Sequence, residues 1–487
     1  MTLPELFAGT FGSRRSDVAL EWDGRVYTFG EIDARANRMA RALQQRGLRD
    51  GDRLAVYLPN CLAYIEVFLA CARVGAILVP VNVLYREREA AHILRDARPA
   101  ALVLDGPAPA STGVTEWQLP SLAAEAAAQA AAPLPPGPRD SSPAALIYTS
   151  GTTGAAKGAV ITQENLAANA RTLVAAWRFT SDDRLLLPLP LFHVHGLGNG
   201  LHCWLLSGCR LRLLRRFDHE TAAAELLDFR PTVLFGVPTM YVRLLEVPLA
   251  AASEVGRHLR LCVSGSAPLV PQVLEEFESR FGHRILERYG MTETLMTLSN
   301  PYEGERRAGA VGLPLPGVEV RLEDNAGRAV DDGQVGELLV SAPTLCAGYW
   351  RRPEATADAF REGWFRTGDL AERSPDGYYT LRGRRSDLII SGGFNIYPRE
   401  IEELLAEHPA VQEAAVAAIP DRLRGEIPVA FVVPVQGTTV RETELIAYCR
   451  ERLASFKVPR EIRRVPSLPK TALGKVLKAR LIETWGA

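Results

Sequence analysis

The chain has 487 residues, a net charge of −1 and 47% hydrophobic residues. A chain of this length can bury large cores and should divide into at least two domains. The charge balance argues against bulk attraction to nucleic acid or to an anionic membrane, so we expect small-molecule partners. The seven cysteines form no CxxC pair, which argues against a zinc centre and a disulfide framework. We also expect no secretion signal and no membrane span, and therefore a cytoplasmic protein.

The first hundred residues alternate between helix and strand patterns. Thr28 and Glu31 form a capping-box pattern that opens a helix. Residues 53–58 then have the composition of a strand, residues 61–74 that of a helix and residues 77–83 that of a second strand. Such alternation is typical of a parallel sheet with crossover helices, so the sequence predicts an α/β fold.

The composition changes twice further along the chain. Residues 106–143 are rich in alanine and proline, which predicts a surface helix and a linker without chemistry. Apolar runs predict further strands at 232–236, 260–264, 318–322 and 336–341. After residue 385 a new αβ unit begins, with predicted strands at 388–390, 414–419 and 429–435. We therefore expect a large multi-sheet N-terminal domain, 1–385, and a small mobile C-terminal domain, 386–487.

A loop rich in glycine and hydroxyl side chains follows the apolar run that ends at Tyr148. Its glycines allow backbone N–H groups to converge, its hydroxyls can donate hydrogen bonds, and Lys157 adds a mobile positive charge. These features predict a polyphosphate site. Ala156 and Gly158 flank Lys157, so the loop is not a Walker A motif, and a nucleotide-switch ATPase is disfavoured.

Lysine is scarce in this chain, where arginine has replaced it almost everywhere. The surviving lysines are expected where a compact ammonium outperforms a planar guanidinium. Besides Lys157 they all lie after residue 456, at Lys457, Lys470, Lys475 and Lys478.

Four other polar segments have individually ordinary explanations as turns, caps or a solvated tail: 264–268, 287–294, 367–369 and 469–475. In order after the glycine-rich loop, they resemble the adenylate-forming superfamily of acyl-CoA synthetases, peptide-synthetase adenylation domains and luciferases. The resemblance covers nearly the whole chain. It implies a large domain that binds ATP and acid and a small domain that rotates about a hinge between two half-reactions. Ser386 departs from the family at this hinge, where Asp or Lys is usual.

The resemblance implies that a carboxylate attacks the α-phosphate of ATP to give an acyl-adenylate, after which a thiol displaces AMP. Thr292 would contact the α-phosphate, Glu293 would hold Mg²⁺ through oxygen ligation, and Lys475 would bridge the carboxylate and the α-phosphate. The residues implied for the β- and γ-phosphates are Thr149, Ser150, Gly151, Thr152, Thr153, Gly154 and Lys157.

The remaining nucleotide and CoA contacts come from the same resemblance. Asp369 would accept both ribose hydroxyls with support from Arg384. The residues implied to frame adenine are Gly265, Ser266, Ala267, Glu287, Arg288, Tyr289 and Gly290. The residues proposed for CoA are Ser391, Gly392 and Gly393 beside the pantetheine, and Lys457 near the phosphates.

Within the family, segments 192–196, 236–239 with Arg243, 264–269 and 306–317 look like malonyl-CoA synthetases. A dicarboxylate brings a second carboxylate into a closed site, where an unpaired charge is costly, so a cation has to meet it. Arg243 and Arg288 are the candidates, with Ser266 as a hydrogen-bond donor. His193 and His195 are expected to shape the pocket rather than bind a metal, because no third ligand is spaced with them.

The sequence leaves alternatives open. The chain could be a CoA ligase for another small, medium-chain or aromatic acid, or a stand-alone enzyme that loads a carrier protein. It could also be a nucleotide-binding sensor without turnover, although Lys475, Glu293 and Asp369 argue against a sensor. The resemblance further implies that a lysine acetyltransferase could switch the enzyme off at Lys475.

Overall fold

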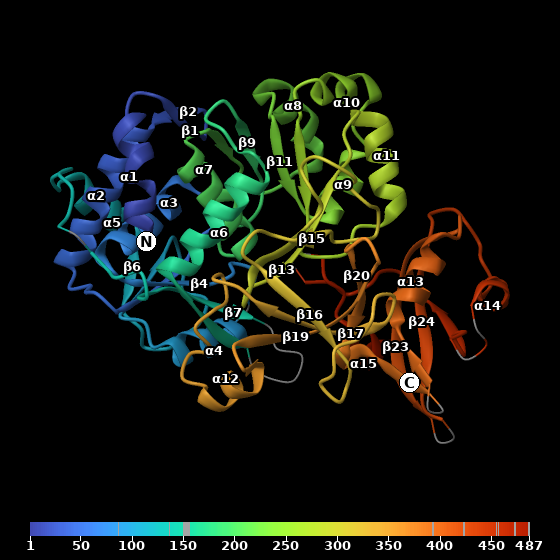
Figure 1. The fold of residues 1–487 in the computed structure, drawn as a ribbon. Helices are drawn as coiled ribbons and strands as arrows, with labels where there is room; N and C mark the ends of the chain where they lie inside the picture. Colours follow the sequence, from blue (N-terminus) through green and yellow to red (C-terminus); the bar gives the residue numbers. More distant parts are fainter. Residues whose placement is uncertain are drawn as a thin grey trace.

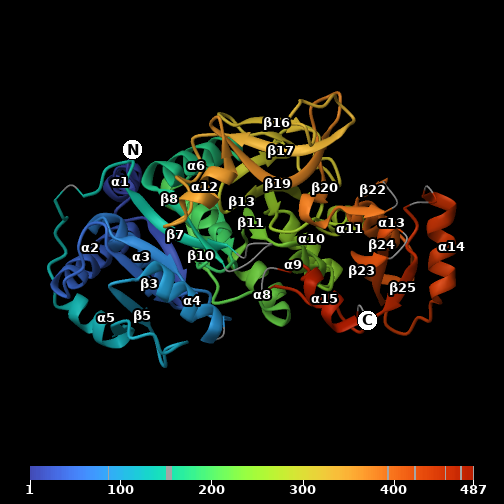
Figure 2. The same ribbon diagram turned by 90° about the horizontal axis from the view of Figure 1, so that it is seen from below.

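A computed structural model describes residues 1–85, 87–135, 137–149, 156–391, 394–421, 424–453, 455, 457–471 and 474–485. The elements before residue 385 make up most of the molecule, and those after it (deep orange to red) form a smaller lobe at one end (Figures 1 and 2). The predicted α/β fold is confirmed.

The first N-terminal sheet has the strand order β6-β5-β3-β4-β7-β8 and is parallel up to β7, which pairs with β8 in the antiparallel sense. Thr28 and Glu31 make the predicted capping box at the start of a helix, since each backbone N–H donates to the other side chain. The strands are β3 (Arg53–Tyr57), β4 (Ile77–Pro80), β5 (Ala101–Leu104), β6 (Glu116–Gln118), β7 (Pro143–Thr149) and β8 (Lys157–Thr162). The helices of this region are α1 (Leu3–Ser13), α2 (Phe29–Gln45), α3 (Leu62–Val74), α4 (Glu87–Ala97), α5 (Leu119–Ala127) and α6 (Gln163–Ala176).

The second sheet has the order β15-β14-β13-β12-β11-β9-β10-β1-β2, and its centre from β1 to β13 is parallel. Because carboxyl ends of parallel strands meet at one edge, the segments after Gly236 and Ser264 lie beside the end of β13. Its strands are β1 (Val18–Trp22), β2 (Arg25–Thr28), β9 (Arg184–Leu187), β10 (Arg210–Leu213), β11 (Val233–Gly236), β12 (Leu261–Ser264), β13 (Leu286–Met291), β14 (Leu295–Ser299) and β15 (Leu313–Pro314). The helices between these strands are the π-helix η1 (His195–Leu201), α7 (His202–Ser207), α8 (His219–Phe229), α9 (Pro238–Leu244), α10 (Leu249–Gly256) and α11 (Pro271–Phe281).

A third, antiparallel sheet completes the N-terminal part and leads into the C-terminal lobe. It has the order β16-β17-β19-β18, with β20 paired to β19. Its elements are β16 (Glu319–Glu323), β17 (Val335–Ser341), α12 (Pro353–Ala359), β18 (Phe360–Arg361), β19 (Trp364–Arg373) and β20 (Tyr379–Arg384). A short 3₁₀ turn, η2 (Arg385–Asp387), then connects to the lobe at the position where the sequence predicts the domain boundary.

The C-terminal lobe is built on its own sheet, of order β22-β21-β24-β23 with β25 parallel to β24. Its two hydrophobic clusters contain only residues from Ile389 onward among those described, so the lobe has its own core. Its elements are β21 (Ile389–Ser391), β22 (Phe394–Ile396), α13 (Pro398–Ala406), β23 (Val411–Asp421), β24 (Gly425–Pro434), α14 (Glu442–Arg452), β25 (Glu461–Arg464) and α15 (Lys478–Trp485).

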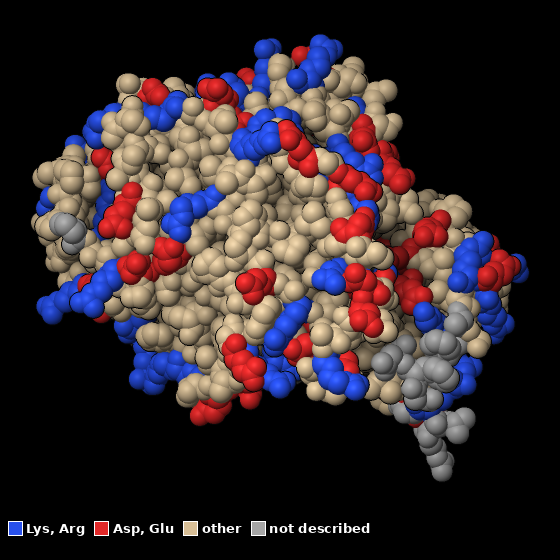
Figure 3. Space-filling view, in the orientation of Figure 1, with Lys and Arg blue, Asp and Glu red and all other residues tan. Residues whose placement is uncertain are grey.

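The surface fits the balanced composition. Figure 3 shows positive and negative side chains interspersed over the visible face, without a broad area of one sign. Across the described part of the chain, no helix combines the length and apolar character needed to cross a membrane.

Candidate functional site

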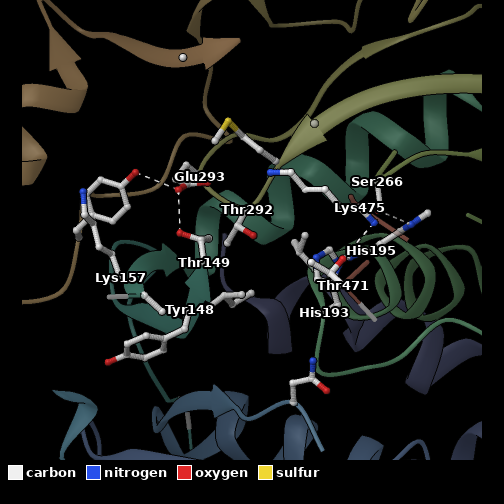
Figure 4. Close-up of a pocket in the computed structure, with 18 of the residues that line it drawn as sticks. Tyr148, Thr149, Lys157, His193, His195, Ser266, Thr292, Glu293, Thr471 and Lys475 are labelled. Atoms are coloured by element: carbon white, nitrogen blue, oxygen red, sulfur yellow. Dashed lines mark hydrogen bonds between the residues drawn. The ribbon is translucent and has the colours of Figure 1, made fainter. Parts of the chain in front are cut away.

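One large cavity collects residues from all three N-terminal sheets and from the C-terminal lobe. Its volume is about 1800 Å³, which is large enough for a nucleotide together with a small acid. Figure 4 shows side chains from the phosphate-loop region, from the end of β13, from η1 and from the lobe gathered around it. The predicted site residues that line it are Thr149, Lys157, His193, His195, Ser266, Arg288, Gly290, Thr292, Glu293, Arg384, Ser386 and Lys475.

The polyphosphate end is organised around Glu293. The hydroxyls of Thr149 and Tyr349 both donate to Glu293 Oε1, at 3.3 and 3.0 Å, and Lys157 Nζ lies 5.2 Å from the centre of the Tyr349 ring. These contacts place a carboxylate, an ammonium and a threonine hydroxyl together at one wall (Figure 4). The other predicted phosphate contacts, Ser150, Gly151, Thr152, Thr153 and Gly154, lie outside the described residues.

The donor set at Glu293 fits Mg²⁺ that arrives with a nucleotide. The described residues contain no cluster of three or more His, Cys, Asp or Glu side chains able to hold a metal. A single carboxylate beside a phosphate site is nonetheless a usual arrangement for Mg²⁺, which takes most of its other ligands from substrate phosphates and water. Glu293 is therefore the side chain that would hold the ion.

The predicted ribose acceptor lies just behind the cavity wall. Asp369 is 6% exposed; its Oδ1 pairs with Arg384 Nε at 2.7 Å and its Oδ2 accepts from the Tyr289 hydroxyl. Burial raises the pKa of Asp369, against the opposing effect of Arg384. Of these residues, Arg384 itself lines the cavity, together with Thr367 and Gly368. A ribose hydroxyl would therefore have to share a carboxylate oxygen with one of these internal partners.

The segment predicted to frame adenine divides into lining and supporting residues. Ser266 and Gly290 line the cavity, and Ser266 has a φ of +72°, a left-handed conformation that is rare for serine. Gly265, Ala267, Glu287 and Tyr289 are not among its lining residues, and their role in framing adenine stays a prediction. A Cβ atom at Gly265 would lie 2.3 Å from the Arg288 guanidinium carbon, so glycine is needed for Arg288 to cross this loop.

Glu287 holds the loop that follows β12 by a hydrogen bond to its backbone. Its Oε1 accepts a 3.1 Å hydrogen bond from the backbone N–H of Leu269, and its Oε2 is buried without a partner among the described residues. Burial raises the pKa of Glu287 to about 7, although Arg399 of the C-terminal lobe opposes the shift. Glu287 thus holds the loop in place through Leu269, and its contact with the nucleotide stays a prediction.

Replacing Glu287 with glutamine is expected to stabilise the protein more at pH 8 than at pH 5. The folded pKa, about 7, exceeds the unfolded value near 4.5, so ionisation lowers the free energy of unfolding of the wild type as the pH rises through this interval. Glutamine keeps an oxygen for Leu269 and removes the ionisation, so the stability gap should widen by roughly 2–3 kcal/mol. Urea unfolding at both pH values measures the difference in free energy of unfolding between the variant and the wild type. Glu275→Gln, on the exposed surface, is the control. A gap that does not change with pH would contradict the buried, protonated carboxyl.

The part of the cavity predicted to hold the acid contains a buried arginine with no hydrogen-bond partner among the described residues. Arg288 is 4% exposed, and its Nε and Nη2 have no hydrogen-bond partner among the described residues. Burial lowers the pKa of Arg288 to about 9, so it stays charged at neutral pH. Burial, reinforced by Arg288, lowers the pKa of His193 to about 4 and that of His195 further, so both rings are neutral. His195 Nδ1 lies 3.2 Å from the hydroxyl of Ser266, which joins these side chains into one polar wall.

The second predicted arginine lies elsewhere. Arg243 is on the exposed side of α9, where Nη1 pairs with Glu246 at 2.7 Å, and it is not part of the cavity lining. The side chains that α9 buries are Tyr241 and Leu244, three residues apart, and this apolar pair turns Arg243 outward. The structure therefore places Arg288, and not Arg243, in the cavity wall with His193, His195 and Ser266.

Lys475 enters the cavity from the C-terminal lobe on a tight turn. The backbone N–H of Thr471 donates to the carbonyl of Lys475, and Gly474 supplies a φ of +82°. A Cβ at Gly474 would lie 3.3 Å from the Thr239 methyl, so this turn packs against α9 of the N-terminal part. The Lys475 side chain is exposed to the open cavity. Partial desolvation by the surrounding protein, together with the charge of Arg384, lowers the pKa of Lys475, and the charge of Asp369 opposes this shift. The lysine therefore lies near Arg384 and Asp369, whose charges act on it in opposite directions.

The residues predicted for CoA are not brought together at the cavity. Ser391 is buried at the end of β21, and Lys457 Nζ pairs with Glu400 at 2.7 Å within the C-terminal lobe. Neither lines the cavity, and Gly392 and Gly393 lie outside the described residues. The CoA contacts stay predictions.

Two of the cavity residues that the sequence reasoning missed are of particular interest, Tyr349 and Asn199. Tyr349, which holds Glu293 and lies under Lys157, follows a glycine in a segment without any pattern that points to phosphate. Asn199 lines the cavity and did leave a signal, because it is a lone amide between Gly198 and Gly200 in a buried apolar stretch.

Comparisons with known proteins agree with this geometry. The AMP-binding enzyme family matches residues 10–350, and the AMP-binding enzyme C-terminal domain matches residues 400–475. The chain is 36% identical to the feruloyl-CoA synthase of Amycolatopsis sp over 96% of both chains. It is 37% identical to the sulfoacetate–CoA ligase of Cupriavidus necator over 99% of both, and 32% identical to the malonate–CoA ligase of Arabidopsis thaliana over 99% of this chain and 88% of the other.

Solved structures match over the whole length as well. ATP-bound MatB from Rhodopseudomonas palustris is 38% identical, with a TM-score of 0.94 over 100% of this chain and 99% of the other. The apo form of MatB gives a TM-score of 0.83, so the overall arrangement here is nearer to the ATP-bound structure. The named relatives support an AMP-forming acid–CoA ligase but differ in the acid. The chain belongs to the AMP-binding enzyme family, within the acyl-CoA synthetase superfamily.

Proposed function

We propose that this protein is an ATP-dependent acid–CoA ligase for a short acid with a second anionic group, with malonate or methylmalonate as the leading substrates. The observation that supports this proposal is the buried guanidinium of Arg288 in the cavity wall, whose Nε and Nη2 have no partner among the described residues. An unpaired charge that is removed from water is costly, and an anionic ligand group is its natural partner. The sulfoacetate and malonate ligases among the relatives both act on doubly anionic acids.

The polar wall around Arg288 has the chemistry that such a group needs. The neutral His193 and His195 and the hydroxyl of Ser266 can donate hydrogen bonds without adding charge. Arg288 alone then balances the distal anion, while the reacting carboxylate points towards Thr292 and Lys475. A purely apolar acid would leave Arg288 without a partner.

The first half-reaction needs charge neutralisation more than acid–base catalysis. One carboxylate oxygen of the acid bonds to the α-phosphorus, and the bond to the bridging oxygen breaks with its electron pair leaving on pyrophosphate. Lys475 and Thr292 stabilise the charge on the α-phosphate, and Thr149 and Lys157 hold the departing end. Mg²⁺ arriving with ATP would supply further neutralisation, and Glu293 would hold it through oxygen ligation.

In the second half-reaction the sulfur of CoA bonds to the acyl carbon, and the bond to the AMP oxygen breaks. CoA is preferred to a carrier protein as the acceptor because the relatives named above are CoA ligases and synthases. Rotation of the C-terminal lobe about η2, acetylation of Lys475 and a cytoplasmic location stay predictions from the family resemblance.

Acid-dependent release of AMP, measured with Mg²⁺-ATP and CoA, tests the proposal. The acids are malonate, methylmalonate, sulfoacetate, succinate, acetate, butyrate and benzoate at equal concentration. We expect a doubly anionic short acid to give the highest rate. A monocarboxylate with the highest rate would keep the ligase chemistry and contradict the role of Arg288. If no acid supports turnover with CoA, pyrophosphate exchange without a thiol distinguishes a carrier-loading enzyme, which exchanges, from a sensor, which does not.

A further inference from the structure

Asn199 lies in the cavity wall and has no role in the chemistry described so far. It is 1% exposed, lines the cavity and belongs to the π-helix η1, a helix type that is often found at functional sites. It follows His195 by four residues on the same helix, a spacing that places both side chains on one face.

The orientation of the Asn199 amide is determined by its neighbours. The backbone N–H of Met296 donates to Asn169 Oδ1 at 3.1 Å, so the other end of the Asn169 amide has to be its NH₂. This NH₂ donates to the carbonyl of Gly198 and to Asn199 Oδ1, both at 3.0 Å. Asn199 therefore presents its oxygen to Asn169, and its own NH₂ is left as a donor.

That NH₂ group has no hydrogen-bond partner among the described residues, although it is buried. The same is true of His195 Nε2 and of two guanidinium nitrogens of Arg288. Buried donors are nearly always paired in native proteins, so a wall with several unpaired donors is shaped for a ligand that accepts from them. Neither of the two asparagines carries a charge. Asn169 therefore fixes the orientation of the Asn199 NH₂ group without adding to the positive potential of the cavity wall.

We propose that Asn199 is a specificity-determining residue that donates to the distal anionic group of the acid, beside Arg288. This inference rests on the proposed function and extends it: the distal group is one with several acceptor oxygens, a carboxylate or a sulfonate, rather than a hydroxyl or an alkyl end. Arg288 balances its charge and Asn199 orients it.

Two substitutions separate this role from a structural one. Asn199→Asp keeps the oxygen that accepts from Asn169 and replaces the donor by an acceptor. Asn199→Leu is similar in size and removes both groups, while Asn169 keeps its contact with Gly198. The substrates are malonate, sulfoacetate and propionate, the last being a three-carbon acid without a second anionic group. Asn169→Ala is the matched control, because it removes the amide clamp from outside the cavity lining.

We expect Asn199→Leu to lower kcat/KM for malonate or sulfoacetate at least tenfold and Asn199→Asp to lower it further, through repulsion. The kcat/KM for propionate should change less than twofold, and the KM for ATP should not change. Asn169→Ala should produce a smaller loss, and thermal unfolding shows whether each variant is folded. An equal loss for all three acids, or none, would overturn the role of Asn199. A wild type that prefers propionate would instead overturn the proposed function.

Discussion

Replacing Lys475 with alanine is expected to lower the rate of acyl-adenylate formation by about 100-fold or more, the usual effect of losing one preorganised transition-state contact. Lys475 is the ammonium that the C-terminal lobe contributes to the cavity near Glu293 and Asp369, whose charges act on it. Thioester formation from supplied acyl-adenylate should survive, because in that step the bond to phosphorus is already made. Acid-dependent pyrophosphate exchange measures the first half-reaction, and release of AMP from acyl-adenylate with CoA measures the second.

The control for Lys475→Ala is Lys478→Ala. Lys478 belongs to the same lobe but pairs with Glu402 at 2.8 Å and does not line the cavity. It should leave both half-reactions within about twofold, as expected for a surface ion pair. If Lys475→Ala reduces both half-reactions equally, Lys475 serves the stability of the lobe rather than adenylation.

Replacing Arg288 with methionine is expected to have two opposite effects. The KM for malonate should rise by about 100-fold, because the second carboxylate loses its charged partner in a site removed from water. In the absence of substrate the protein should become more stable, by about 1 kcal/mol or more, because the variant no longer buries an unpartnered guanidinium. The KM for ATP should stay within about threefold, since methionine has a similar length and preserves the packing over Gly265.

Steady-state kinetics with malonate and butyrate and thermal unfolding without ligand measure the two effects of Arg288→Met. Arg257→Met is the control, because Arg257 is exposed and pairs with Glu254 at 2.8 Å. A fall in stability together with an equal loss of activity on malonate and butyrate would show that Arg288 supports the loop rather than the substrate.

The sequence predicts the N-terminal strands well because their apolar runs are fully buried in parallel sheets. The strand predicted at 77–83 is β4 over its first four residues, and the helix predicted at 61–74 is α3. The nucleotide-site motifs were found for a related reason. The segments 264–268 and 287–294 lie at the ends of β12 and β13, which pair in parallel, so these two meet at one sheet edge. The family resemblance assigned every motif to the site without its contacts.

Predictions that needed a side-chain direction or a long-range partner were less successful. The face of the short helix α9 is decided by the packing of Tyr241 and Leu244, and this packing turns Arg243 away from the acid. Local sequence also carries no sign that Lys457 pairs with Glu400, 57 residues earlier in the chain, although its contact with CoA stays a prediction. The orientation of the Asn199 amide is set by hydrogen bonds through Asn169 to Met296. These residues come from three separate segments, so the chain of hydrogen bonds cannot be inferred before the segments are packed together.

Each lobe keeps its own hydrophobic core, while the cavity takes its walls from both. Because these clusters are separate among the described residues, we expect the two parts to be able to open at different free energies when no ligand is bound. A nucleotide that touches Lys475 on one side and Thr292 on the other adds its binding free energy only to states in which both units are folded. The substrate is thus also a thermodynamic link between the lobes, and their unfolding becomes cooperative in proportion to how tightly it binds.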